Sequence, residues 1–316
     1  MNLSDRTKII IEINKLLYEE GFETSNIYDK SCFDMFARKK LLLLLLKVLV
    51  NIDSLNQSHV HEIKKISNTF QASPLVVGLK SKNHILEEDV VYERYGMPTI
   101  ALETLKNIII HGEYPEILAD RGGYFVQIAG DLLKDYRTEF SLSLKELADL
   151  VKVSRETIYN YENNLSRANP ETAILLEELL NMKITLDIDV FQPKKFEVEE
   201  NEVSKNENIN DLKKLGLGVV STNKTPFDAL GKIEAKKIND SFITSLDDNK
   251  PTKTLHNVAI SLKDLSLITG SDSFFIINNE KIKESLDGIP VINSWEIKEI
   301  DDKNEFLKLV KERKDN

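Results

Sequence analysis

The apolar positions in the first third of the chain alternate between a helical and a strand-like spacing. From Arg6 to Glu20 they recur three and four residues apart, the pattern of a helix with one buried face. The run from Leu41 to Val50 is almost continuously apolar, as in a strand covered on both sides. A helix is predicted at 58–70, and strands at 75–78 and within 90–100. This alternation favours an α/β sandwich with helices on both faces of a central sheet.

Between Asp131 and Leu180 the polar residues stand where short helices would begin and end. Ser143 precedes an amphipathic run and has Glu146 three residues later, a pair that forms a capping box. Ser154 is a second N-cap, and the helix that follows is predicted from Arg155 to Asn163. The short segment between the two helices leaves room only for a tight turn. Two short helices joined in this way predict an all-α helix-turn-helix domain.

The residue order of this segment resembles the Cro/XRE-type helix-turn-helix family. The landmarks are L-L-K-D-Y-R, S-L-K-E-L-A-D-L, V-S-R-E-T-I-Y-N-Y-E and N-P-E-T. The resemblance implies a recognition helix in the major groove of double-stranded DNA, where Arg can make two hydrogen bonds to guanine and Asn two to adenine. The predicted DNA-binding residues are Ser154 and Thr157 on phosphates, Arg155, Glu156, Tyr159 and Asn160 toward base edges, and Asn164 and Arg167 on the backbone. Alternatively, any of these residues is part of a solvated helix face.

Three other positions are interpreted as structural. Arg137 and Glu162 match an internal ion pair of the same family, so neither is expected to contact DNA. Lys152 stands where the turn commonly has glycine, which predicts an unfavourable backbone conformation at this residue.

The overall charge limits how such a domain could bind DNA. The chain has a net charge of -10 and a pI near 5.2. Residues 131–180 contain six Lys or Arg and ten Asp or Glu, a local net charge of -4. Nonspecific affinity should therefore be weak. We expect a homodimer on a two-part operator, because a second copy doubles the contacts with phosphate. A protein partner in place of DNA is the alternative that the acidic surface leaves open.

The N-terminal part resembles the restriction-endonuclease-like, or PD-(D/E)XK, fold. Its order is a helix, a strand that carries Asp34 and a strand that carries Lys47. Nuclease chemistry needs at least two carboxylates for a magnesium ion. The acidic residue expected two positions before Lys47 is Leu45. We therefore expect the fold to be retained, with no catalytic residues, no metal site and no cofactor. Asp34 and Lys47 are more simply an internal ion pair.

The C-terminal part repeats short segments of the N-terminal part in the same order. Phe227-Asp228-Ala229 matches Phe33-Asp34-Met35, and Gly288-Ile289-Pro290 matches Gly96-Met97-Pro98. We interpret it as a second degenerate α/β domain that is an internal repeat of the first, without an equivalent of Lys47. The predicted domains are 1–122 (nuclease-like), 123–190 (helix-turn-helix), 191–214 (a linker rich in Lys, Glu and Asn) and 215–316 (second α/β).

Composition excludes other classes of protein. The single cysteine, Cys32, rules out an internal disulfide framework and fits a cytoplasmic protein. The N-terminus does not resemble a signal peptide, and the run at 41–50 is too short for a bilayer. The whole arrangement resembles archaeal helix-turn-helix transcriptional regulators. It implies a sequence-specific DNA-binding regulator, with a small-molecule effector left open. A metal-dependent endonuclease guided by the same helices is the alternative, and a protein-binding adaptor is a third.

Overall fold

A computed structural model describes residues 4–82, 84–198, 206–234, 239–246, 251–278 and 284–314. The chain divides into two compact units. The first unit contains residues 1–48, 55–75 and 191–316, and the second contains residues 49–54 and 76–190. These units do not coincide with the boundaries predicted from the sequence, because strands of the N-terminal sheet belong partly to each.

The N-terminal part is built around an eight-stranded sheet with the order β1-β2-β3-β4-β6-β5-β7-β8. Its strands are β1 (Glu23–Thr24), β2 (Met35–Lys39), β3 (Leu42–Asn51), β4 (Ser73–Lys80), β5 (Val90–Arg94), β6 (Met97–Ala101), β7 (Ile117–Asp120) and β8 (Gly123–Val126). The accompanying helices are α1 (Asp5–Glu19), η1 (Ile52–Ser54), α2 (Gln57–Phe70), α3 (Leu102–Lys106) and η2 (Asn107–His111). The predicted alternation of helices and buried strands is confirmed. Ser4 caps α1 and Asn56 caps α2 through their side chains.

The C-terminal part has its own six-stranded sheet. Its strands are β9 (Gly218–Ser221), β10 (Ala229–Glu234), β11 (Asn239–Leu246), β12 (Asp272–Ile276), β13 (Ser285–Leu286) and β14 (Ile289–Ile292). Its helices are α8 (Glu207–Lys214), α9 (Thr252–Thr269), α10 (Ser294–Glu299) and α11 (Lys303–Lys314). One core joins the sheet to α8, α10 and α11 through buried Leu212, Phe274, Ile297 and Phe306. The expected α/β fold class is confirmed for both parts.

The segment interpreted as a linker is more ordered than expected. Its last residues form α8, in which Ile209 and Leu212 are buried in the C-terminal core. At its beginning, the backbone of Phe196 exchanges hydrogen bonds with the Asn68 side chain, and Phe191 accepts one from Ser73. The linker interpretation is corrected for these two parts, and residues 199–205 lie outside the described residues. The polar composition of this segment predicted a linker without regular structure. Two apolar residues on one face are nevertheless enough to anchor a short polar helix to a core.

The two sheets have the same strand order. Written from its other edge, the C-terminal order β9-β10-β11-β12-β14-β13 matches β1-β2-β3-β4-β6-β5. The tight turn before β6 has two residues with positive φ, Tyr95 and Gly96, and the turn before β14 has Asp287 and Gly288. In both sheets this turn joins an antiparallel pair of strands. The similarity therefore extends from short sequence matches to backbone conformation.

Within the first unit, the two parts contact each other through corresponding elements. The loop before β2 packs on α9, where the Tyr28 hydroxyl donates to Asp264 at 2.6 Å. The loop after β9 packs on α2, where Glu62 accepts from the Asn223 N–H at 3.1 Å, and Lys65 of α2 donates to the carbonyl of Ser221, the last residue of β9. Burial raises the pKa of the Tyr28 hydroxyl, and the hydrogen bond to Asp264 and the negative charge of this carboxylate raise it further. These loop-on-helix faces are thus occupied inside one chain.

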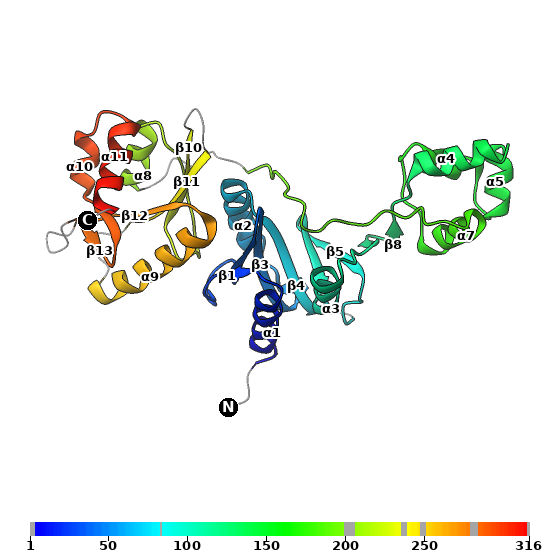
Figure 1. Cartoon of the computed structure of the whole chain (residues 1–316), viewed down its shortest axis with the longest axis horizontal. Coiled ribbons are helices and arrows are strands. Elements are labelled where there is room, and N and C mark those ends of the chain that lie inside the picture. Colours follow the sequence, from blue (N-terminus) through cyan, green and yellow to red (C-terminus); the bar gives the residue numbers. More distant parts are fainter. Residues whose placement is uncertain are drawn as a thin grey trace. The chain divides into compact units, whose positions relative to one another are not determined.

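Four helices form the all-α domain: α4 (Gly130–Glu139), α5 (Leu144–Leu150), α6 (Arg155–Glu162) and α7 (Pro170–Leu180). The capping box of Ser143 and Glu146 is present, and Asn169 caps α7 directly before Pro170. Figure 1 shows α4, α5 and α7 grouped around a common centre. The core contains Leu133, Leu147, Ala148, Val151, Ile158, Tyr161, Ala173, Leu176 and Leu180. The sequence prediction of this domain is confirmed helix by helix.

Candidate nucleic-acid interface

The predicted recognition helix α6 begins where the sequence places it. The Ser154 side chain accepts a hydrogen bond from the Thr157 N–H at 3.0 Å, and the two hydroxyl groups lie 2.8 Å apart. The turn before it is tight because Lys152 adopts the left-handed conformation expected there, with φ 57°. Ser154 and Thr157 therefore lie together at the start of α6.

The two faces of α6 differ sharply in exposure. Ile158 and Tyr161 are buried in the domain core. Arg155 and Glu156 are exposed, and Tyr159 is 46% exposed although it is aromatic. Thr157 and Asn160 are half-buried. The residues predicted to approach base edges thus share the outer side of a short, well-anchored helix, although the exposure of Asn160 is partial.

A buried ion pair holds α6 against α4. Arg137 donates to both oxygens of Glu162, at 2.5 and 3.0 Å, and also to the Leu142 carbonyl. This hydrogen bond and the charge of Glu162 raise the pKa of Arg137. The backbones approach closely near the same place, since a Cβ on Gly130 would lie 2.5 Å from the Tyr161 carbonyl oxygen. Arg137 and Glu162 therefore form the internal ion pair that the sequence predicted.

The loop after α6 is tied to a β-hairpin that the sequence analysis missed. Arg167 forms an ion pair with Asp120 of the hairpin at 3.5 Å, with both side chains about half exposed. Asn164 has φ 56° and accepts a weak hydrogen bond from Gln127 at 3.4 Å. The hairpin consists of β7 and β8, and Val126 at its end exchanges backbone hydrogen bonds with Ala168. Arg167 is therefore partly engaged, which the sequence did not predict.

A sequence signal for this hairpin exists. Gly122 and Gly123 both have positive φ and separate two short apolar segments. A Gly-Gly pair between such segments is typical of a hairpin turn. The sequence identifies the turn but not its partner, because the pairing with Ala168 depends on the tertiary fold.

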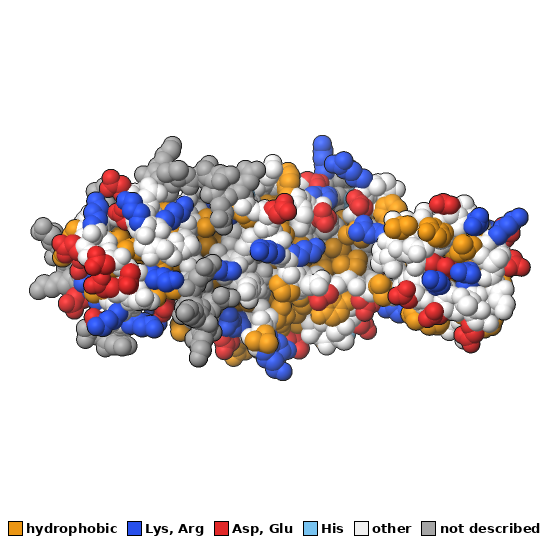
Figure 2. All heavy atoms as spheres, turned by 90° about the horizontal axis from the view of Figure 1, so that it is seen from above, with side chains coloured by type: hydrophobic (Ala, Val, Ile, Leu, Met, Phe, Trp, Pro, Cys, Tyr) orange, Lys and Arg blue, Asp and Glu red, His pale blue; other side chains and the backbone are white. Residues whose placement is uncertain are grey.

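The helical domain has no single large basic patch on the face that Figure 2 shows. Lys and Arg, Asp and Glu, and apolar side chains are interspersed there. This agrees with the acidic composition of residues 131–180. Any electrostatic attraction of this domain to an anion must therefore come from a few Lys or Arg side chains at specific positions.

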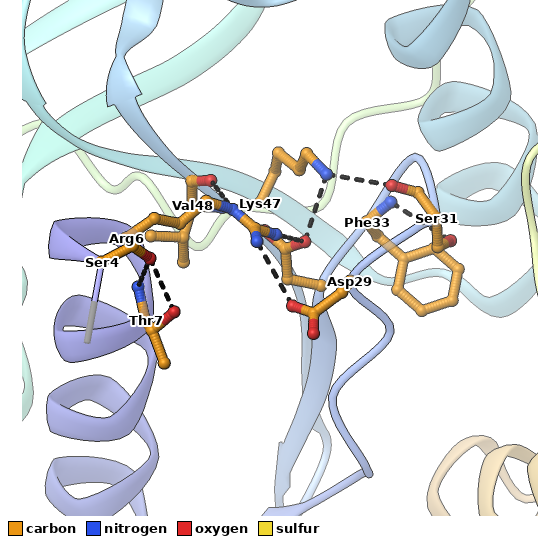
Figure 3. Close-up of polar contacts among 9 residues, drawn as sticks. Ser4, Arg6, Thr7, Asp29, Ser31, Phe33, Lys47 and Val48 are labelled. Atoms are coloured by element: carbon orange, nitrogen blue, oxygen red, sulfur yellow. Dashed lines mark hydrogen bonds and ion pairs between the residues drawn. The ribbon is translucent and has the colours of Figure 1, made fainter. Parts of the chain in front are cut away.

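The second candidate site is a cluster of charges around Asp34 and Lys47. Figure 3 shows Arg6, Lys47 and Val48 of this cluster together with Ser31 and Asp29. Asp34 is fully buried and accepts from Arg6 at 2.5 Å, from Lys47 at 3.1 Å and from the Val48 N–H at 2.6 Å. Lys47 also donates to the Ser31 carbonyl at 2.9 Å. Both oxygens of Asp34 are thus occupied by donors of this chain. The ion pair that the sequence predicted is present, with Arg6 as an additional member.

The neighbouring positions do not supply the ligands that a divalent cation needs. Leu45, where the nuclease pattern has a carboxylate, is buried. No cluster of three or more His, Cys, Asp or Glu side chains suited to a metal occurs in the part of the chain that the structure describes. The residues present therefore do not fit the magnesium site of a nuclease.

At the corresponding place in the C-terminal sheet, the carboxylate of Asp228 takes the position of Asp34. Asp228 accepts from the Leu246 N–H at 2.9 Å and from the Ser245 hydroxyl at 2.6 Å. Ser245 precedes the N–H donor as Lys47 does in the first sheet, so serine replaces lysine.

Comparison with known proteins agrees with this architecture. Residues 6–115 match the PD-(D/E)XK superfamily domain, and residues 133–186 match a helix-turn-helix family. A protein of Methanobrevibacter smithii is 56% identical over 312 residues, covering 99% of both chains. A protein of Methanothermobacter thermautotrophicus is 53% identical, covering 98% of this chain and 97% of its own. One from Pyrococcus furiosus is 34% identical, covering 98% of both. Each is described as a "Putative HTH-type transcriptional regulatory protein".

The fold and the matched segments define a protein that joins a PD-(D/E)XK-type α/β domain to an XRE-type helix-turn-helix domain. With close relatives aligned over nearly its whole length, this chain belongs to the family of archaeal helix-turn-helix-type transcriptional regulatory proteins. The family resemblance seen in the sequence is confirmed. Within the described ranges, no helix combines the length and the apolar character needed to cross a membrane.

Proposed function

We propose that this protein is a sequence-specific transcriptional regulator that inserts α6 into the major groove of double-stranded DNA. The observation that carries the proposal is the geometry of α6. Its inner face is fixed by core packing and by the Arg137–Glu162 ion pair, while Arg155 and Tyr159 remain exposed on its outer side. A rigid helix with free polar groups suits base recognition, because hydrogen-bond specificity depends on fixed positions of donors and acceptors.

Dimerisation is part of the proposal. One chain carries one recognition helix and an acidic helical domain, so a single copy would make few phosphate contacts. Two copies would place two recognition helices about 34–36 Å apart, one turn of DNA. The loop-on-helix faces around Tyr28 and Glu62 are already used within the chain. The dimer contact must therefore use other surfaces. A cytoplasmic location and a possible small-molecule effector remain expectations of the same proposal.

Selection of duplexes from a random pool by the purified full chain tests this function. We expect enrichment of a two-part sequence whose half-sites are centred about 10 base pairs apart, or a multiple of one turn. Binding should weaken steeply as salt rises. Enrichment of no sequence, together with no salt-dependent binding of any duplex, would contradict the proposal and favour the protein-binding adaptor.

We also propose that the protein does not cleave DNA. Asp34 is saturated by Arg6, Lys47 and a backbone N–H, and the position of the second carboxylate is Leu45. The endonuclease alternative predicts that supercoiled DNA is nicked in the presence of Mg²⁺ or Mn²⁺. Incubation of parent and Asp34→Asn proteins with such DNA distinguishes the two functions. Cleavage by the parent that the variant lacks would overturn our choice.

A further inference from the structure

The surface between the β7–β8 hairpin and the loop after α6 is hollowed. This hollow has a volume of about 550 Å³ and lies entirely within the second unit. It is lined by Asp120, Arg121, Phe125, Gln127, Asn164, Leu165, Ser166 and Arg167. Two arginines and one aspartate give this hollow a net positive charge in a domain that is otherwise acidic.

The two backbone segments that carry the arginines of the hollow are fixed to each other. The hydrogen bonds that Val126 exchanges with Ala168, at 2.8 and 2.9 Å, fix the hairpin to the loop. Arg121 lies at the hairpin turn, next to Gly122 and Gly123. A Cβ at either glycine would meet nothing within 4 Å, so the turn is open to a ligand. Among the described residues, the exposed Arg121 side chain has no acidic partner within ion-pair distance.

Asp120 partly neutralises the hollow. Its carboxylate accepts from the Arg121 N–H at 2.7 Å and pairs with the Arg167 guanidinium at 3.5 Å. The pair with Arg167 is long and about half exposed, so it is weak and can be exchanged for a stronger anion. A phosphate bears its charge on oxygens that an arginine fork binds with two hydrogen bonds.

We propose that this hollow binds a phosphodiester of the DNA backbone beside the groove that α6 enters, with Arg121 of the hairpin as a new contact and Arg167 as its neighbour. The hairpin then acts as a wing that flanks the recognition helix. The inference rests on the proposed function and extends it to residues outside the helix-turn-helix. It also explains how an acidic domain could gain backbone affinity without a large basic patch.

Two substitutions with opposite predicted effects test the inference in the full chain. The probes are a duplex selected by the parent from a random pool and a scrambled duplex of equal length, titrated by fluorescence anisotropy. Arg121→Ala should weaken binding to both duplexes about fivefold to tenfold at 0.1 M salt, because one phosphate contact changes the salt slope by about one. Asp120→Asn should strengthen binding to both duplexes about threefold, because it removes a negative charge that repels the DNA phosphate. The amide oxygen of asparagine can still accept the hydrogen bond from the Arg121 N–H.

Lys15→Ala is the charge-matched control. It removes one exposed cation from α1, in the first unit, and should leave affinity and salt slope unchanged. Misfolding would lower the affinity for DNA, so a gain of affinity in Asp120→Asn can be attributed to the substituted charge. If the parent prefers the selected duplex but both hairpin variants bind as the parent does, the inference is overturned and the proposed function stands. If the parent binds no duplex, both are overturned.

Discussion

Removal of the Asp34 carboxylate should destabilise the first compact unit strongly. Asp34→Ala leaves Lys47, whose side chain is only 8% exposed, without its carboxylate partner. It also leaves the buried Val48 N–H without its acceptor. Breaking a buried pair from one side costs about 3–5 kcal/mol, because the remaining charge stays desolvated. We expect a loss in this range for the free energy of unfolding.

A double-mutant cycle separates the ion pair from the other contacts of Asp34. Lys47→Met alone should cost about 1–2 kcal/mol, since Asp34 keeps Arg6 and the Val48 N–H. The double variant Asp34→Ala/Lys47→Met should lose about 2 kcal/mol less than the sum of the two single losses, because no unpaired lysine remains. Asp29→Ala is the matched control. Its carboxylate is 72% exposed and pairs with the same Arg6, so its loss should change stability by about 0.5 kcal/mol or less.

Urea unfolding followed by circular dichroism and by tryptophan fluorescence measures these differences. The single tryptophan, Trp295, lies on α10 in the same compact unit as Asp34, and circular dichroism follows the helices and strands of the whole chain. Stabilities are compared only where the urea dependence is unchanged. If Asp34→Ala unfolds within 1 kcal/mol of the parent, or is more stable, the carboxylate is not held as a structural ion pair.

Three further variants test the packing and electrostatics of the helical domain. Gly130→Ala should cost about 1–3 kcal/mol by thermal unfolding, because its Cβ would meet the backbone of α6 at 2.5 Å, and an unchanged melting temperature would refute that close approach. Lys152→Gly should gain about 1 kcal/mol, since φ 57° is unfavourable for lysine, and a loss would show that the side chain has a role of its own. Burial alone would raise the pKa of Glu177, but backbone N–H groups of Thr185 and Ile184, the Thr185 hydroxyl and the nearby Lys183 lower it below its usual 4.5. The carboxylate therefore stabilises the fold above the unfolded-state pKa and loses this effect as pH falls through the lower folded-state pKa. Glu177→Gln should be less stable than the parent at pH 7, with the difference disappearing as pH falls through the lowered folded-state pKa of Glu177, and a difference independent of pH would exclude this linkage.

The elements that the sequence predicted well are those with local causes. The helices α5, α6 and α7 begin at Ser143, Ser154 and Asn169, whose side chains bond the N–H groups of their own first turn. The left-handed conformation of Lys152 was expected because the family resemblance places this residue where the turn commonly has glycine. Such features depend on residues within a few positions of one another, so one sequence contains all the information needed.

The features that the sequence did not predict depend on distant partners. Arg6 belongs to α1, which lies far from Asp34 in the sequence, yet it donates a hydrogen bond to the Asp34 carboxylate. The ion pair of Arg167 with Asp120 and the bridge from Val126 to Ala168 join segments that are far apart in the sequence. Likewise, the sequence did not predict α8 within a polar segment, because its two buried apolar residues, Ile209 and Leu212, gain their partners only in the C-terminal core.

The central claim is that exposed side chains of α6 recognise specific base pairs. The most direct test is the affinity of Arg155→Ala for the duplex that the parent selects, measured beside a scrambled duplex by anisotropy, with Lys15→Ala as control. We predict that the variant loses roughly 1–3 kcal/mol of binding free energy on the selected duplex and little on the scrambled one, with the fold unchanged by circular dichroism. Equal affinity of variant and parent for the selected duplex would contradict the claim.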